Sequence, residues 1–145
     1  MDWRQTALAE ANAVKAAFAE RHGWAPVVDV GEEAVDLFVR LHGKHLGEKT
    51  YLLRLRYLPD WQLAGRRESF VDPDDRSREG REFWPPAAAV RGVNPDYQPD
   101  PGAPVMPCVC LRGVYGYHSV LHTNERPDNT TLLRFLLELQ GVIDE

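Results

Sequence analysis

Prolines are unevenly distributed along this 145-residue chain, and seven of them fall between Pro85 and Pro107. Each proline fixes φ and removes a backbone N–H, so a segment this rich in proline forms neither a helix nor the interior of a sheet. We therefore expect an ordered coil from residue 85 to 107 that wraps the domain. The helices and strands must come from the residues before and after it.

An amphipathic helix is expected at the start of the chain, from Asp2 to His22. Apolar side chains recur there at steps of three and four, and Asp2 and Gly23 are suited to cap its two ends. The residues of the apolar face are Trp3, Ala7, Ala11, Val14 and Phe18. This face should pack on a sheet.

Alternating apolar and polar residues predict strands from Ala34 to Leu41 and from Thr50 to Leu58. The segment between them, Gly43 to Gly47, has the length and glycine content of a hairpin connection. Val27 to Val30 and Ser69 to Val71 are two shorter candidates. The economical arrangement is an antiparallel meander of three to four strands.

After the expected strands, the mixed charges from Asp72 to Glu82 predict a turn followed by a solvated loop. Phe83-Trp84-Pro85-Pro86 has two interpretations, an exposed aromatic docking surface or an anchor that holds the coil to the core. Leucines from Thr131 to Ile143 predict a C-terminal helix with one apolar stripe. The residues of that stripe are Leu132, Leu136, Leu139 and Ile143. The expected fold is a single α+β domain spanning residues 1–145.

The composition argues against several functional classes. A net charge of -5 gives no broad basic surface, so duplex nucleic acid is not the expected partner. No apolar run approaches the roughly 18 residues of a membrane span, and the first residues lack the apolar core of a signal peptide. We expect a soluble cytoplasmic protein that binds neither nucleic acid nor membrane, with its cysteines kept as thiols.

The end of the proline-rich segment carries both cysteines, in the run Pro107-Cys108-Val109-Cys110-Leu111. A thiol on irregular backbone ahead of a packed helix is suited to carry an acyl group, if a neighbouring histidine or helix terminus favours the thiolate. His118 is the candidate for this activating role. The alternative is a buried, inert cysteine.

A zinc site is a second interpretation of the same residues. Cys110, His118 and His122 are ligand types that zinc accepts, and Cys108 is the nearest fourth ligand. The spacing is not that of a standard zinc finger. A carboxylate is an alternative to Cys108 in this set, and the candidates are Glu79, Glu82 and Glu125.

The order of these elements, and several short motifs, resemble those of ubiquitin-conjugating enzymes. Ala34 to Leu58 resembles the family's second and third strands, Leu58-Pro59-Asp60-Trp61 its turn after the third strand, and Ser69 to Val71 its fourth strand. Val109-Cys110-Leu111 matches the sequence around the family's catalytic cysteine. Leu136 to Ile143 resembles the helix that follows it.

The resemblance implies a UBC-like fold in which the proline-rich coil carries the cysteine. It further implies a transferase-like role for Cys110, which would accept the C-terminus of a ubiquitin-like modifier as a thioester. The implied partners are the modifier, its activating enzyme and a metal-dependent deubiquitinase-like peptidase, and no cofactor is implied. The divergent bacterial relatives that accompany ubiquitin-like modifiers are the branch most similar to this chain.

The chain departs from the family at two points. The histidine-proline-asparagine triplet, whose asparagine is assigned to the oxyanion, is absent, and Asn94-Pro95 is the nearest candidate with its order reversed. The segment after Cys110 is also longer and contains His118 and His122. A related family is described as a predicted metal-binding domain with cysteine, glutamate and two histidines. By that resemblance Cys110, His118, His122 and Glu82 form a zinc site without conjugating activity, in an accessory or interaction module.

Overall fold

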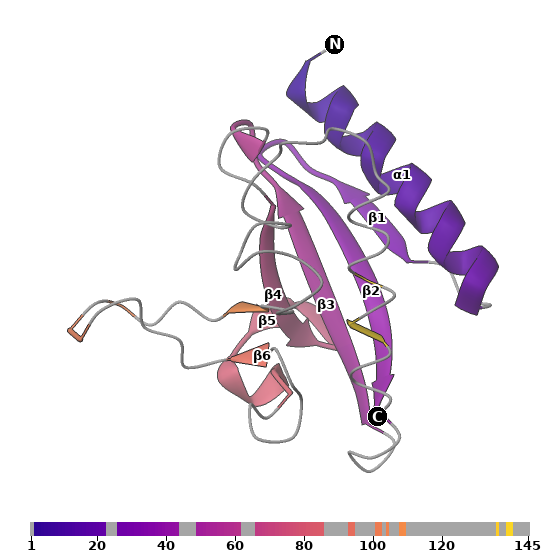
Figure 1. Ribbon diagram of the computed structural model, residues 1–145. Coiled ribbons are helices and arrows are strands. Elements are labelled where there is room, and N and C mark those ends of the chain that lie inside the picture. The colour runs from indigo at the N-terminus through magenta and orange to yellow at the C-terminus, as the bar shows by residue number, and fades with distance from the viewer. Residues whose placement is uncertain are drawn as a thin grey trace.

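One long helix packs against one face of an antiparallel sheet in the computed structural model of this chain (Figure 1). The structure describes residues 2–22, 26–43, 49–61, 66–85, 93–94, 101–102, 104, 108–109, 136 and 139–140. The predicted α+β class is confirmed. A single domain over residues 1–145 stays a prediction.

The helix α1 (Trp3–His22) begins one residue after the predicted start at Asp2 and ends at the predicted residue. Asp2 accepts a hydrogen bond from the Gln5 backbone N–H at 2.8 Å, and the Asp2 N–H donates to the Gln5 side-chain oxygen at 3.1 Å. These reciprocal bonds satisfy two N–H groups that the first turn of a helix leaves without intrahelical partners. The cap at Asp2 was predicted, but the returning bond from Gln5 was not.

The sheet contains five strands in the order β1-β2-β3-β4-β5, and every neighbouring pair is antiparallel. Their bounds are β1 (Val27–Val30), β2 (Val35–Gly43), β3 (Lys49–Tyr57), β4 (Arg67–Asp72) and β5 (Asp75–Glu79). The predicted meander is present, with one strand more than the three to four expected. Because Gly43 lies opposite Lys49, the predicted β2–β3 hairpin closes through residues 44–48, which lie outside the described residues.

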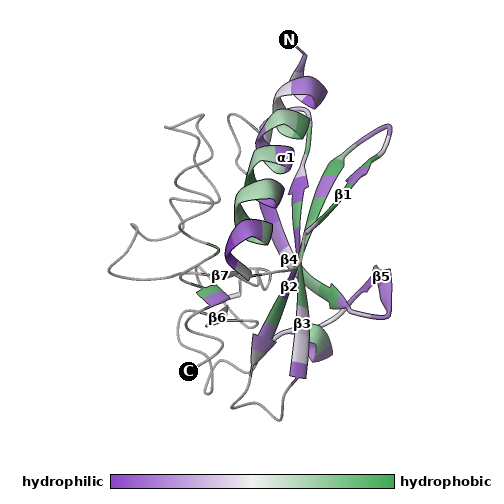
Figure 2. Ribbon diagram, turned by 90° about the vertical axis from the view of Figure 1, so that its right-hand side faces the viewer, coloured by the Kyte–Doolittle hydropathy of each residue, from purple (hydrophilic) through white to green (hydrophobic). Residues whose placement is uncertain are grey.

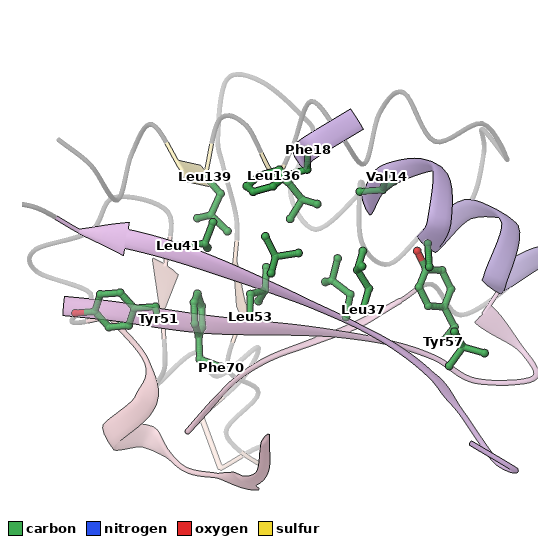
Figure 3. Packing of buried hydrophobic residues seen from close by; sticks show 14 of the residues in the cluster. Val14, Phe18, Leu37, Leu41, Tyr51, Leu53, Tyr57, Phe70, Leu136 and Leu139 are labelled. Atoms are coloured by element: carbon green, nitrogen blue, oxygen red, sulfur yellow. The ribbon is translucent and has the colours of Figure 1, made fainter. Parts of the chain in front are cut away.

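Alternation along the strands divides the sheet into two faces, and the face toward α1 is here called the inner face. The inner-face residues of β2 and β3 are fully or almost fully buried and form the main core with the apolar stripe of α1. Figure 3 shows Phe18, Leu136 and Leu139 lying over the same strands. The members of this core on the three elements are Ala7, Ala11, Val14, Phe18, Val35, Leu37, Val39, Leu41, Tyr51, Leu53, Leu55 and Tyr57.

The predicted C-terminal helix is represented by three described residues, Leu136, Leu139 and Gln140, which are helical and buried. The Gln140 side chain donates to the His42 carbonyl at 3.0 Å and accepts from the His42 N–H at 3.1 Å. β1 pairs with β2 only from Val35 to Phe38, so Gln140 bonds to β2 beyond the end of β1. The other residues of the predicted helix lie outside the described part.

The opposite, outer face of the sheet holds a small cluster of Phe38, Leu52 and Val71, and charged residues such as Arg54 occupy neighbouring positions of the same face. β5 curls over this face, on the side away from α1 (Figure 2). Its Arg76 lies 5.1 Å from the centre of the Phe38 ring and 3.4 Å from Asp29 on the first strand. The sheet is therefore strongly curled, since a side chain of the last strand reaches the first.

Two predictions of irregular structure were wrong. The charged segment Asp72–Glu82 is not all turn and loop, because Asp75–Glu79 forms β5. Its side chains are all exposed and lack apolar alternation, so the backbone pairing with β4 and ion pairs such as Arg78–Asp72 at 3.2 Å hold the strand. The proline-rich segment also contains β6 (Val93–Asn94), which precedes Pro95 and therefore keeps its N–H groups.

Candidate functional site

A short strand carries the backbone of the cysteine segment. β7 (Cys108–Val109) pairs antiparallel with β6, so that Asn94 lies opposite Cys108 and Val93 lies opposite Val109. β7 also lies beside β4, with Cα atoms of the two strands within 8 Å. Figure 2 shows the β6–β7 pair on the same side of the sheet as α1. The segment before Cys110 is therefore joined to Asn94 and lies against the central sheet.

The start of the proline-rich segment is fixed by an aromatic contact. Trp84 is buried, and its ring meets Phe70 of β4 at 5.1 Å between centroids, with the rings tilted by 66°. Pro85 is buried, and Phe83, at the end of the 3₁₀ turn η2 (Arg81–Phe83), is partly buried against the core. Of the two interpretations of the Phe83–Trp84 run, the anchor is the one observed.

The structure describes only some of the residues that are predicted to act in acyl transfer or in zinc binding. Cys110, His118 and His122 lie outside the described residues, as does Glu125. For Cys108 the structure gives the backbone position in β7. The proposed roles of these residues, as nucleophile, activating base or zinc ligands, stay predictions.

The two remaining carboxylates of the predicted zinc set are described. Glu82 is exposed in the η2 turn. Glu79, on β5, forms an ion pair with Arg54, whose own side chain is buried on the outer face. Glu79 therefore lies on the face opposite α1, away from the β6–β7 pair. Its carboxylate is already paired with Arg54. Among the described residues no three histidine, cysteine, aspartate or glutamate side chains are grouped closely enough to hold a metal.

A buried ion pair on the inner face was not predicted. Arg66 donates from Nε to Glu10 Oε2 at 3.0 Å and from a second guanidinium nitrogen to Glu10 Oε1, and both side chains are 3% exposed. The guanidinium lies 5.8 Å from the Tyr57 ring centre and 5.2 Å from the Trp61 ring centre. The pair thus joins α1 to the residue just before β4, and the rings of Tyr57 and Trp61 lie beside it.

Burial and the interactions within the cluster together set the pKa values of Arg66 and Tyr57. Burial opposes the charge on Arg66, but the hydrogen bonds and negative charge of Glu10 outweigh it, so the pKa of Arg66 is raised. The pKa of the Tyr57 hydroxyl is raised well above its usual value, first by burial and then by the charge of Glu10. At neutral pH the cluster is therefore an ion pair beside a neutral phenol.

One signal in the sequence does point to the pair. Glu10 lies three residues after Ala7 and four before Val14, which places it beside the apolar stripe of α1. A carboxylate there must be paired with a cation because an isolated buried charge is very costly. The position of Arg66 as the partner depends on the fold and is not evident from spacing.

Comparison of the chain with protein families, with curated proteins and with solved structures found no match. Among the described residues, no helix combines the length and apolar character needed to cross a bilayer.

Proposed function

We propose that this chain has the UBC-like fold and carries a ubiquitin-like modifier as a thioester on Cys110. The observation that supports this most directly is the pairing of β7 with β6. Acyl transfer at a thiol passes through a tetrahedral oxyanion, which needs a nearby hydrogen-bond donor. The backbone of Asn94 lies opposite Cys108, two positions before Cys110, so Asn94 is the proposed source of that donor.

The element order adds a second line of support. A helix, an antiparallel meander, the cysteine segment and a final helical segment follow one another along the chain, as the resemblance implies. Leu136 and Leu139 bury against the sheet face that α1 also covers. The segment after the cysteine is thereby joined to the same core.

The proposed reaction has two balanced steps. The Cys110 thiolate attacks the modifier's C-terminal carbonyl while it is held as a thioester on the activating enzyme. A new S–C bond forms, and the enzyme's thiolate leaves and takes a proton. An amine of the acceptor then attacks the Cys110 thioester, so that an N–C bond forms, the Cys110 thiolate leaves, and the amine proton passes to His118 or to water.

The partners in this proposal are the modifier, its activating enzyme and an acceptor amine. A metal-dependent deubiquitinase-like peptidase would reverse the conjugation. No cofactor is required of this chain, because the activating enzyme supplies the acyl group already activated.

A loading assay tests the proposal. The full chain is incubated with a candidate modifier, its activating enzyme and ATP, and the products are separated with and without reductant. We expect an adduct that reductant cleaves in the wild type and in Cys108→Ala, but that is missing in Cys110→Ala. Asn94→Ala should still load but should transfer to free amine at a rate reduced by roughly 10²-fold, the scale of one lost oxyanion donor.

A metal measurement separates the zinc interpretation from the carrier. The untagged chain, purified without chelator, is analysed for metal by elemental analysis. A metal-free folded chain agrees with a carrier thiol. About one zinc per chain, lost together with stability in both Cys110→Ser and His118→Ala, would instead identify Cys110 as a ligand and contradict the carrier.

A further inference from the structure

The first strand, β1, forms one end of the strand order in the sheet. Gly31 donates to the Ala34 carbonyl at 2.9 Å, so by alternation Val27 and Asp29 direct their N–H and C=O groups toward β2. The N–H and C=O groups of Val28 and Val30 then point away from the sheet. Within the described part of the chain, β2 is the only strand that pairs with β1.

Exposed apolar residues of β1 lie on both faces of the sheet, with Val27 opposite Phe38 on the outer face and Val30 opposite Val35 on the inner face. Val27 is 43% exposed and Val30 is 53% exposed, and they are the large apolar residues counted as exposed among the described residues. A strand edge that combines free backbone groups with apolar side chains is a template for another strand. The geometry therefore specifies an occupant in extended conformation.

The edge is held in place from both sides. On the inner side, Arg4 of α1 donates to the Glu32 carbonyl in the turn after β1. On the outer side, Arg76 of β5 lies 3.4 Å from Asp29. An edge fixed in this way loses little conformational freedom when a strand is added, which favours binding.

A second copy of this chain is a poor occupant. A two-fold dimer would pair the strands antiparallel, with Val28 or Val30 opposite Val28 or Val30 of the other copy. If Val28 lies opposite Val28, then Val30 lies opposite Pro26, which has no N–H to donate. If Val30 lies opposite Val30, then Val28 lies opposite Glu32, which is beyond the end of the strand. Val28 opposite Val30 uses both residues but sets Asp29 directly against Asp29, which is destabilising.

We propose that β1 binds an extended segment of a partner protein that carries lysine or arginine opposite Asp29 and apolar residues opposite Val27, Val28 and Val30. The segment adds antiparallel to β1, with backbone hydrogen bonds to Val28 and Val30. Its basic side chain meets the carboxylate of Asp29, whose side chain is 54% exposed. This proposal is independent of the Cys110 chemistry.

The test uses the ¹⁵N-labelled full chain and synthetic ten-residue peptides built around Val-Arg-Val-Val with polar flanks. We expect the amide resonances of Val28 and Val30 to shift and to become protected from exchange. A matched peptide with glutamate in place of arginine should bind at least about tenfold more weakly, because it sets two carboxylates opposite each other. A peptide methylated on the nitrogens that face β1 should not bind.

Charge-swap variants check the direction of the preference. Asp29→Lys should prefer the glutamate peptide, and Asp29→Asn should show little preference. Arg76→Ser, which removes the existing ion pair but not the backbone pairing of β1 with β2, should still prefer the arginine peptide. The proposal is overturned if both peptides bind equally or not at all, if the shifts lie outside β1, or if the chain dimerises through β1 in a manner lost in Val30→Lys.

Discussion

Glu10 and Arg66 form a charged pair inside the core, enclosed by Tyr57 and Trp61. Removing two charges from water costs several kcal/mol per ion, and their attraction and hydrogen bonds offset this cost only while both partners are present. The pair therefore fixes how α1 meets the entry to β4 more than it adds net stability. Either side chain without the other would be an unpaired buried charge and would destabilise the fold.

Breaking the pair should be more damaging than removing it. We expect Glu10→Met or Arg66→Met to lower the free energy of unfolding by about 3–5 kcal/mol, because each leaves one uncompensated buried charge. The double variant Glu10→Met with Arg66→Met should lie closer to the wild type than either single variant. Urea denaturation of the four proteins measures this, and additive losses in the double variant would contradict it.

Tyr57 should make the fold sensitive to alkali. Its raised pKa means that the folded chain keeps the phenol proton to a higher pH than the unfolded chain does. This contribution to stability is therefore fully present below the usual pKa of 10.0 and is lost as pH rises above it. We expect the free energy of unfolding to fall above pH 10, and Tyr57→Phe to show a smaller fall.

Denaturant titrations on both sides of pH 10 measure this slope. Tyr51→Phe is the control, because burial raises the pKa of Tyr51 as well but the charge of Glu10 is not among the causes. Equal alkaline losses in the wild type and in Tyr57→Phe would show that the Tyr57 phenol is not responsible.

At the scale of elements, side-chain contacts join segments that are far apart in the sequence. Trp84 packs on Phe70 of β4, and Gln140 bonds to the backbone of His42 at the end of β2. The primary amide of glutamine has both donor and acceptor groups, so it bonds to His42 as a neighbour strand would, beyond the part of β2 that pairs with β1. These contacts fix where the coil begins and where the C-terminal segment lies.

The Gln140 contact can be tested by an apolar replacement of similar size. We expect Gln140→Leu to lower the free energy of unfolding by about 1–2 kcal/mol, since both hydrogen bonds to His42 are lost. Gln140→Glu, which keeps the acceptor but sets a buried carboxylate against the His42 carbonyl, should be destabilised at least as much as Gln140→Leu at neutral pH. Thermal and urea unfolding measure the change, and a Gln140→Leu variant as stable as the wild type would show that the contact contributes nothing.

At the scale of the whole molecule, the arrangement was predictable where the pattern is periodic. The stripe of α1 and the alternation in β2 and β3 predicted the helix, the central hairpin and the inner face of the core. β5 was missed because its side chains are all exposed and charged, so its pairing depends on backbone bonds and on ion pairs to distant strands. The curl of the sheet was not predicted either. It brings Arg76 of β5 to Asp29 of β1, and these two residues are far apart in the sequence.

The candidate site was predictable in part for similar reasons. The cysteine motif is local, so it was evident from the sequence. The pairing of Asn94 with Cys108 joins two ends of a proline-rich segment, and no periodic pattern signals such a contact. The Glu10–Arg66 pair depends on tertiary packing in the same way.

The central claim is that Cys110 is a reactive carrier thiol, and competitive alkylation tests it with the protein alone. The native chain is treated with limiting iodoacetamide over a range of pH, and the modified cysteine is located by peptide mass spectrometry. We expect Cys110 to react before Cys108, with a pH midpoint below the ~8.5 of a free thiol that moves upward in His118→Ala. A Cys110 that stays unreactive in the metal-free folded chain would contradict the account.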